Sequence, residues 1–224
     1  MTQAGKAVAL ISTFGAISGV GAYAGGLFSS SSSKAQETKS AATIIVKVSN
    51  RSSLEKEGFE VLDTSKDSPE WKAVLEEYKK ATVKSFTKKQ EADKSEESLR
   101  NNCKDILDKE KDTNYPLARQ WCVKKQKISE VLKKGKRKLL NFEESEVEGE
   151  KVHWEAKIAE LKKDKSKFAS ISGNIKDQET EVGDNIKAFK AGCKALETDT
   201  IETTNDKFET NFALAREWCS VDEQ

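Results

Sequence analysis

Residues 117–122 read Leu-Ala-Arg-Gln-Trp-Cys and residues 214–219 read Leu-Ala-Arg-Glu-Trp-Cys, so one six-residue string occurs twice with a single exchange. Trp and Cys are rare in this chain, with four of each among 224 residues. All four Trp and all four Cys fall at equivalent places in two successive stretches of sequence. The pattern predicts an internal repeat, which must be settled before any fold is assigned.

The repeat extends upstream of the two strings. Phe59 precedes Trp71 by twelve residues, and Phe142 precedes Trp154 by the same distance. We therefore expect Phe59 and Phe142 to occupy equivalent positions in the two copies.

Apolar residues recur at helical spacing and predict three helices in each copy. The first copy spans residues 51–127 and the second spans 128–224. In the first, the apolar stripes run from Trp71 to Phe86, from Leu99 to Leu107 and from Leu117 to Cys122. In the second, they run from Trp154 to Phe168, from Ile186 to Leu196 and from Phe208 to Cys219. Ser68-Pro69, Ser95 and Tyr115-Pro116 are start signals for the helices of the first copy.

The composition supports an all-α body. Charged residues make up 34% of the chain, Pro occurs twice, and aromatic residues reach only 7%. These values favour Lys- and Glu-rich helices over a strand sandwich. Because 39 basic residues face 38 acidic ones, no global charge favours nucleic acid, and we expect none as a partner.

Residues 7–28 contain no charged side chain, which is about the length needed to cross a bilayer. Lys6 precedes them and favours an N-terminus inside the cell with the remainder outside. The segment is either an uncleaved, single-pass signal anchor, which we favour, or a signal peptide cleaved after Ala24, in which case the protein is secreted. Residues 1–28 thus form the predicted membrane segment, and residues 29–50 form a Ser-rich flexible linker.

Small residues within this segment allow two further interpretations. Gly15, Gly19, Gly21 and Gly25 give small-xxx-small spacings through which such helices could pair into a homodimer. Residues 19–24 also match GxGxxA, but they lead into five consecutive serines rather than into a helix and an acidic residue, so we expect no dinucleotide and no other cofactor.

The four cysteines favour one disulfide within each copy, Cys103 with Cys122 and Cys193 with Cys219. Each such bridge stabilises its unit by about 3 kcal/mol in the loop-entropy model. Reduced, buried cysteines are the alternative if the body lies inside the cell. A four-thiolate metal site lacks the CxxC spacing that zinc sites use, so we expect no metal.

The other residues of the repeated motif are predicted to be structural. They are Trp71, Arg119, Trp121, Trp154, Arg216 and Trp218. Arg is scarce in the chain, with five residues, yet two of these lie in the strings. A guanidinium can bond a carboxylate through two N–H groups or stack on an indole, so we expect both arginines to hold the unit together, with ligand binding as the alternative.

The segment from 124 to 138 carries the only strong local charge. Its basic residues are Lys124, Lys125, Lys127, Lys133, Lys134, Lys136, Arg137 and Lys138. They could contact an acidic partner. Acidic residues follow at once from 143 to 150, so a solvated linker neutralised by its neighbours is the favoured interpretation.

No catalytic motif is present in the sequence. His153 is the only histidine, and no Ser or Cys partner stands in a recognisable motif with it. We therefore expect a protein that is not an enzyme.

A set of motifs resembles the large paralogous families of uncharacterised, presumed membrane or surface proteins of haemotrophic mycoplasmas. The set comprises an N-terminal apolar segment, Gly58-Phe59 followed by Leu62-Asp63, Cys103 to Leu107, and Tyr115 to Cys122. The resemblance implies a membrane-anchored, non-enzymatic surface protein, antigen- or adhesin-like, facing host protein or glycan. The alternative function is a tethered or intracellular scaffold that binds acidic partners through the basic segment. The second copy departs from the pattern, with Phe212 where Tyr115 stands.

Overall fold

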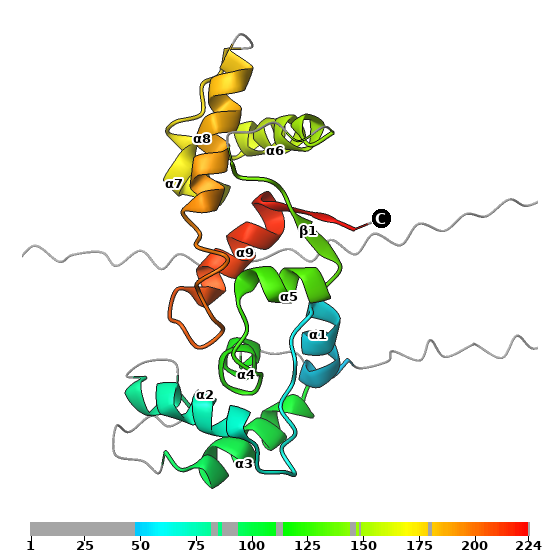
Figure 1. The fold of residues 1–224 in the computed structure, drawn as a ribbon, viewed down its shortest axis with the longest axis vertical. Coiled ribbons are helices and arrows are strands. Elements are labelled where there is room, and N and C mark those ends of the chain that lie inside the picture. Colours follow the sequence, from blue (N-terminus) through cyan, green and yellow to red (C-terminus); the bar gives the residue numbers. More distant parts are fainter. Residues whose placement is uncertain are drawn as a thin grey trace, which may run out of the picture. The chain divides into compact units, whose positions relative to one another are not determined.

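The computed structural model describes residues 48–81, 85–86, 94–110, 114–143, 147, 149–178 and 181–223. Within these residues the protein is mostly helical, with nine α-helices, one short 3-10 helix and one pair of strands (Figure 1). The all-α prediction is therefore confirmed in its coarse form, and the small sheet is an addition to it. The predicted membrane segment, residues 7–28, and residues 29–47 of the predicted linker lie outside the described residues.

Among the described helices, none has both the length and the apolar composition needed to cross a membrane.

The first half of the body contains four helices. They are α1 (Asn50–Glu57), α2 (Pro69–Lys80), α3 (Glu96–Leu107) and α4 (Tyr115–Trp121). All three helix starts predicted for the first copy are confirmed. α2 begins at Pro69, α4 begins at Tyr115, and the Ser95 hydroxyl accepts a hydrogen bond from the Ser98 amide at the start of α3. The stripe that predicted α2 as far as Phe86 was wrong in its extent. The helix ends at Lys80, and Phe86 returns from the following loop to pack on Tyr78, with 6.2 Å between ring centroids.

The second half contains five α-helices, one 3-10 helix and both strands. They are α5 (Ile128–Lys134), β1 (Arg137–Leu139), α6 (Lys151–Lys163), η1 (Lys165–Phe168), α7 (Ala169–Ser172), α8 (Val182–Lys194), α9 (Phe208–Trp218) and β2 (Ser220–Asp222). The stripe from Trp154 to Phe168 is divided, because α6 ends at Lys163 and Phe168 lies in the 3-10 turn that follows.

Each half begins with a short helix that the three-helix prediction did not contain. α1 has 8 residues and α5 has 7, which is too short for apolar periodicity to stand out. α1 begins at Asn50, and the preceding Ser49 side chain accepts a hydrogen bond from the Ser52 amide. The predicted linker, residues 29–50, therefore extends too far, because its last residues already belong to the start of α1.

Backbone hydrogen bonds fix the true alignment of the two copies. In the first half the Leu62 amide donates to the Cys122 carbonyl at 3.0 Å, and in the second the Leu140 amide donates to the Cys219 carbonyl at 3.0 Å. Leu62 and Leu140 are 78 positions apart, and the same offset relates the starts of α1 and α5. The expected equivalence of Phe59 with Phe142 is therefore wrong, since those residues are 83 positions apart.

The chain that follows each repeated string pairs with the chain that precedes the longer helices. In the first half this pairing is a single antiparallel bridge between Val61 and Val123. In the second half it extends into the antiparallel strands β1 and β2, with Leu139 opposite Ser220. The two-stranded sheet is thus the longer version of a contact that both halves make.

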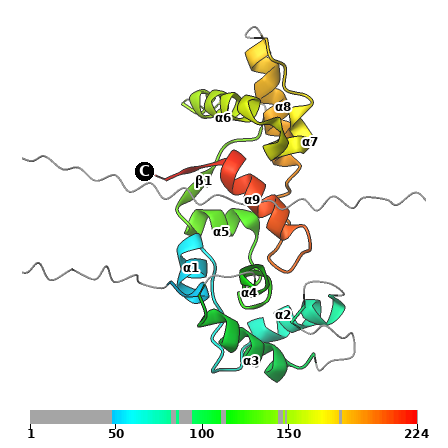
Figure 2. The ribbon, with the colours of Figure 1, turned by 180° about the vertical axis from the view of Figure 1, so that it is seen from behind.

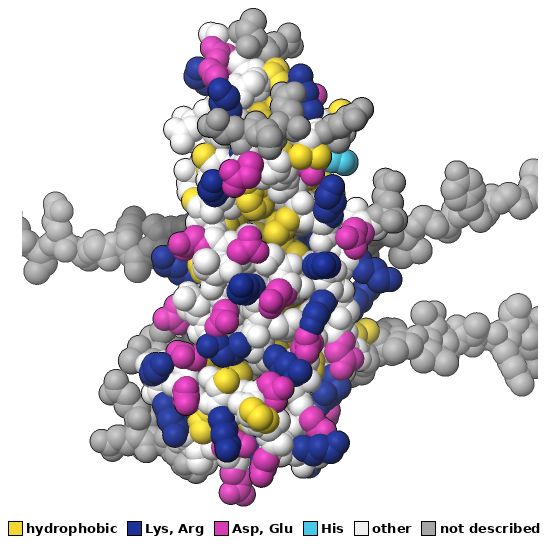
Figure 3. Space-filling model, viewed as in Figure 1, with side chains coloured by type: hydrophobic (Ala, Val, Ile, Leu, Met, Phe, Trp, Pro, Cys, Tyr) yellow, Lys and Arg dark blue, Asp and Glu magenta, His cyan; other side chains and the backbone are white. Residues whose placement is uncertain are grey.

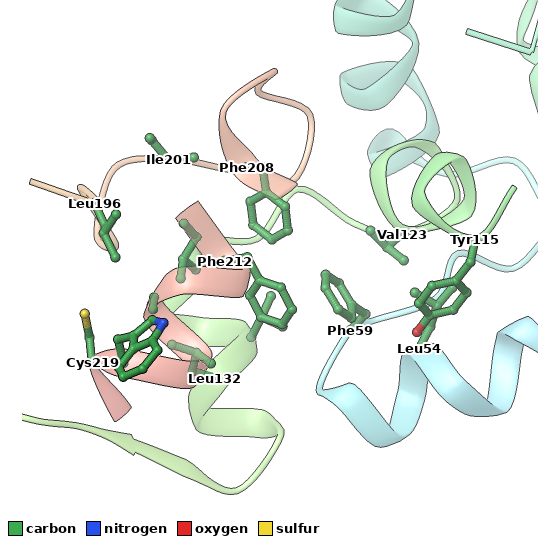
Figure 4. Close-up of a cluster of buried hydrophobic side chains, with 14 of the residues drawn as sticks. Leu54, Phe59, Tyr115, Val123, Leu132, Leu196, Ile201, Phe208, Phe212 and Cys219 are labelled. Carbon is green, nitrogen blue, oxygen red and sulfur yellow. The ribbon is translucent and has the colours of Figure 1, made fainter. Parts of the chain in front are cut away.

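The halves share one hydrophobic core. Phe59 of the first half lies 6.0 Å from the ring centroid of Phe208 and 5.3 Å from that of Phe212, both on α9 (Figure 4). Helix α5 contacts both α1 and α9, as Figures 1 and 2 show. Gly58 and Gly135 allow this approach, because a Cβ on Gly58 would stand 2.1 Å from the Val131 carbonyl oxygen and one on Gly135 would stand 2.6 Å from that of Glu57.

Candidate functional site

The four cysteines form two disulfides with the predicted pairing. Cys103 on α3 is bonded to Cys122 after α4, with 5.4 Å between Cα atoms, and Cys193 on α8 is bonded to Cys219 after α9, with 5.6 Å. All four are fully buried. Each bond therefore joins two helices of one half, and neither the reduced nor the four-thiolate alternative describes this structure.

All four tryptophans of the motif are buried, but their indole N–H groups differ in whether they have a hydrogen-bond acceptor. The Trp71 Nε1 donates to the Asp63 carbonyl oxygen at 2.9 Å. The Nε1 atoms of Trp154 and Trp218, in the second half, have no hydrogen-bond partner among the described residues. A buried donor without an acceptor is costly, on the order of 1–3 kcal/mol, so this difference between the halves needs a physical cause.

Arg119 joins the two halves. Its Nε lies 2.9 Å from Oε1 of Glu209 and its second terminal nitrogen lies 2.5 Å from Oε2, which makes a two-point bond to a carboxylate on α9. The remaining terminal nitrogen bonds Glu57 of α1 at 3.2 Å. The guanidinium also lies 5.4 Å from the Phe212 ring centroid and 5.3 Å from that of Tyr115.

Arg216 stands at the same place in the second string and has different surroundings. Its closest ion pair among the described residues is with Glu57 at 4.0 Å, and its side chain is 48% exposed. Together with Arg119 and Arg137 it lines an open cavity of about 480 Å³. Burial, together with the charge of Arg216, lowers the pKa of Arg137, while Asp222 opposes that shift. The structural role predicted for both arginines is thus seen at Arg119 alone.

The basic segment is part of the fold and is not a linker. It contains α5, where Ile128, Val131 and Leu132 are buried, and β1. The composition did not indicate these apolar residues, because the lysines on either side of them dominate the segment.

Most of the basic side chains in this segment have acidic neighbours. The pairs, with nitrogen–oxygen distances, are Lys124–Glu60 at 3.1 Å, Lys125–Glu202 at 2.9 Å, Lys134–Glu60, Arg137–Asp222 at 2.6 Å and Lys138–Glu150 at 3.3 Å. Figure 3 shows basic and acidic side chains interspersed over one face of the body, without a region of a single sign. The segment therefore offers an acidic partner few uncompensated charges.

His153 lies exposed in the first turn of α6. Across the part of the chain that the structure describes, no group of three or more His, Cys, Asp or Glu side chains is arranged to hold a metal ion.

A cavity between α6 and α8 was not predicted. Its volume is about 510 Å³, and lysines from both helices line it, namely Lys151, Lys187, Lys190 and Lys194. A smaller cavity of about 150 Å³ shares Lys151, Ile186 and Lys190 with it and reaches Trp154. The signal in the sequence was the spacing of Lys187, Lys190 and Lys194 at i, i+3 and i+7, which places them on one helix face.

Comparisons with protein-family models, with curated proteins and with solved structures found no match to this chain.

Proposed function

We propose that the protein is a non-enzymatic surface protein, anchored in the cell membrane by residues 7–28, with its helical body outside the cell. The observation that carries the proposal is the pair of buried disulfides, one in each half. Disulfides persist in oxidising surroundings and are rare where thiols are kept reduced. The bonds therefore favour a body that has been exported.

The body in this proposal consists of two tandem units, each built around a Trp–Cys frame. The tryptophans and cysteines are buried in the core, while most Lys and Glu side chains lie on the surface. Surface side chains tolerate exchange far better than core side chains do, so such a body can vary what it presents and keep its fold. That property suits an antigen or an adhesin that contacts host protein or glycan.

The membrane attachment rests on the sequence of the first 28 residues. Lys6 before the apolar run favours the outward orientation of the body. Cleavage after Ala24 would release the same body as a secreted protein, and the Gly spacings of the anchor would allow two copies to pair.

Treatment of intact native cells with an external protease tests the proposal. We expect the full-length band to disappear without lysis and a small membrane-bound N-terminal fragment to remain, while a cytosolic marker protein stays intact. A body that resists the protease until the cells are lysed, and is then cut at once, would refute the external location.

A further inference from the structure

The cavity between α6 and α8 lies in the half whose connection to its first tryptophan is the longer one. Asp63 and Asn141 are equivalent by the 78-residue offset, and eight residues separate Asp63 from Trp71 whereas thirteen separate Asn141 from Trp154. In the first half the Asp63 carbonyl accepts the Trp71 indole N–H. In the second half the Trp154 indole N–H has no acceptor among the described residues.

The walls of this cavity combine cationic and apolar groups. Among the described residues its lining holds the four lysines and one acidic residue, Glu143. Phe142, Val182 and Ile186 supply apolar surface, and Val182 is 37% exposed although it is a large hydrophobic residue. A volume of about 510 Å³ lies within the range of small-molecule pockets, roughly 300–1,000 Å³.

Two of the four lysines bond to Glu143, and the charges of the other two are less neutralised by acidic neighbours. The Lys190 ammonium donates to the Glu143 main-chain oxygen at 2.7 Å, and Lys194 lies 3.2 Å from the Glu143 carboxylate. Among the described residues Lys151 and Lys187 make no ion pair. Asp184, which precedes Lys187 by three residues on α8, pairs with Lys176 at 3.2 Å and also attracts Lys187 electrostatically.

Two helix starts add to the positive character of the walls. Lys151 is the first residue of α6, and Val182 and Gly183 are the first two of α8. The preceding residues, Glu150 and Glu181, make no side-chain capping hydrogen bond to these helices, and the helix dipole adds a partial positive charge at each start.

We propose that this cavity binds a small organic anion, in which a carboxylate or phosphate group is joined to an apolar group. The acidic oxygens lie between Lys151 and Lys187, and the apolar part contacts Phe142 and Ile186.

Calorimetric titration of the full chain with defined probes tests the proposal. The probes are 3-phenylpropionate and phenyl phosphate, and the controls are the neutral 3-phenylpropionamide and inorganic phosphate. We expect saturable one-site binding of at least one probe, and at least tenfold weaker binding of both controls. The absence of saturable binding by either probe, or equal binding of inorganic phosphate, would overturn the proposal.

A matched pair of glycine variants locates the binding. A Cβ on Gly183, which lines the cavity, or on Gly173, which does not, meets no atom within 4 Å, so a larger side chain fits at either place. Gly183→Trp fills the cavity and should weaken probe binding at least tenfold, whereas Gly173→Trp should leave it within twofold. Equal effects of the two substitutions would place the binding elsewhere.

Charge removal provides a second test that does not fill the cavity. The double variant Lys151→Gln, Lys187→Gln should weaken binding at least tenfold, and the exposed control pair Lys72→Gln, Lys133→Gln should not. The indole N–H signals of the four tryptophans supply an independent signature in nitrogen-15 NMR. The signal assigned to Trp154 by its loss in Trp154→Phe should move on titration while that of Trp71 stays in place, and the reverse result would contradict the proposed site.

Discussion

The two halves of the body are copies that close differently. Both join two of their helices by a disulfide and bury their tryptophans. In both, the residue after the Trp-Cys string pairs with the residue immediately before Leu62 or Leu140. The first half closes over Trp71 with its own Asp63 carbonyl, while the second inserts five more residues and leaves Trp154 beside a cavity. The two copies of the repeated core therefore differ in what surrounds their first tryptophan.

The two arginines of the repeated string also differ in their surroundings, although they occupy the same place in the string. Arg119 is 16% exposed and binds two carboxylates, whereas Arg216 is 48% exposed and has one distant ion pair among the described residues. The string itself determines that an Arg follows Leu-Ala. Its partners come from elements distant in sequence, such as Glu209, ninety residues from Arg119.

The largest expected effect concerns the core that joins the halves. Phe59→Ala removes a buried ring that packs on Phe208 and Phe212 and should lower the free energy of unfolding by about 3–5 kcal/mol. Since the ring belongs to both halves, calorimetry should show one transition at a lower temperature. Two separate transitions, with one left at its original temperature, would show that the halves fold independently.

Loss of the disulfides should come next in size. Replacement of Cys103 and Cys122 by Ser, or of Cys193 and Cys219 by Ser, should each cost about 3 kcal/mol, and slightly more for the second pair because it spans 26 residues rather than 19. Urea unfolding of both variants and of the unaltered protein measures this. A cost below 1 kcal/mol for either pair would mean that the shared core, rather than the bond, holds that half closed.

The arginine pair offers a sharper comparison. Arg119→Met should cost on the order of 2–3 kcal/mol, because it leaves Glu209 and Glu57 without their shared cation in a largely buried place. Arg216→Met should cost less than about 0.5 kcal/mol. Similar losses in urea unfolding would mean that the two strings play the same role after all.

The tryptophan pair tests the same contrast inside the core. Trp71→Phe removes a ring segment and a hydrogen bond, whereas Trp154→Phe removes a ring segment and a buried donor that has no acceptor. We expect Trp71→Phe to be the more destabilising by roughly 1–2 kcal/mol. Equal losses would indicate that Trp154 acquires an acceptor in solution.

Alkaline pH should lower the stability of the protein partly through Tyr115, whose counterpart in the second half cannot ionise. Burial and the Glu57 carboxylate raise the pKa of Tyr115 above its usual value, while the equivalent residue of the second half is Phe212. The unfolded chain releases this proton near pH ~10 and the folded chain does not, so the contribution is present below that pH and is lost as the pH rises above it. Between neutral pH and pH ~10.5, the free energy of unfolding should therefore fall further in the unaltered protein than in Tyr115→Phe. The extra loss should be less than ~1 kcal/mol.

The sequence predicted those features that depend on local spacing or on the repeat itself. Helix starts at Pro69 and Ser95, the two Cys pairs and the burial of the four tryptophans all follow from residue type at fixed intervals. α5 was not predicted because its buried Ile128, Val131 and Leu132 lie in a seven-residue helix within a Lys-rich segment. The cavity could not be predicted, because it depends on which residues align between the copies, and the matching spacings of Phe59 and Phe142 gave the wrong alignment.

The most direct test of the external, bridged body is thiol labelling of intact native cells with a membrane-impermeant reagent, with and without prior reduction, followed by mass spectrometry. We predict that label appears only after reduction, and that unreduced peptides link Cys103 to Cys122 and Cys193 to Cys219. Thiols that stay unlabelled on intact cells even after reduction, yet react freely without reductant once the cells are lysed, would contradict both the disulfides and the location outside the cell.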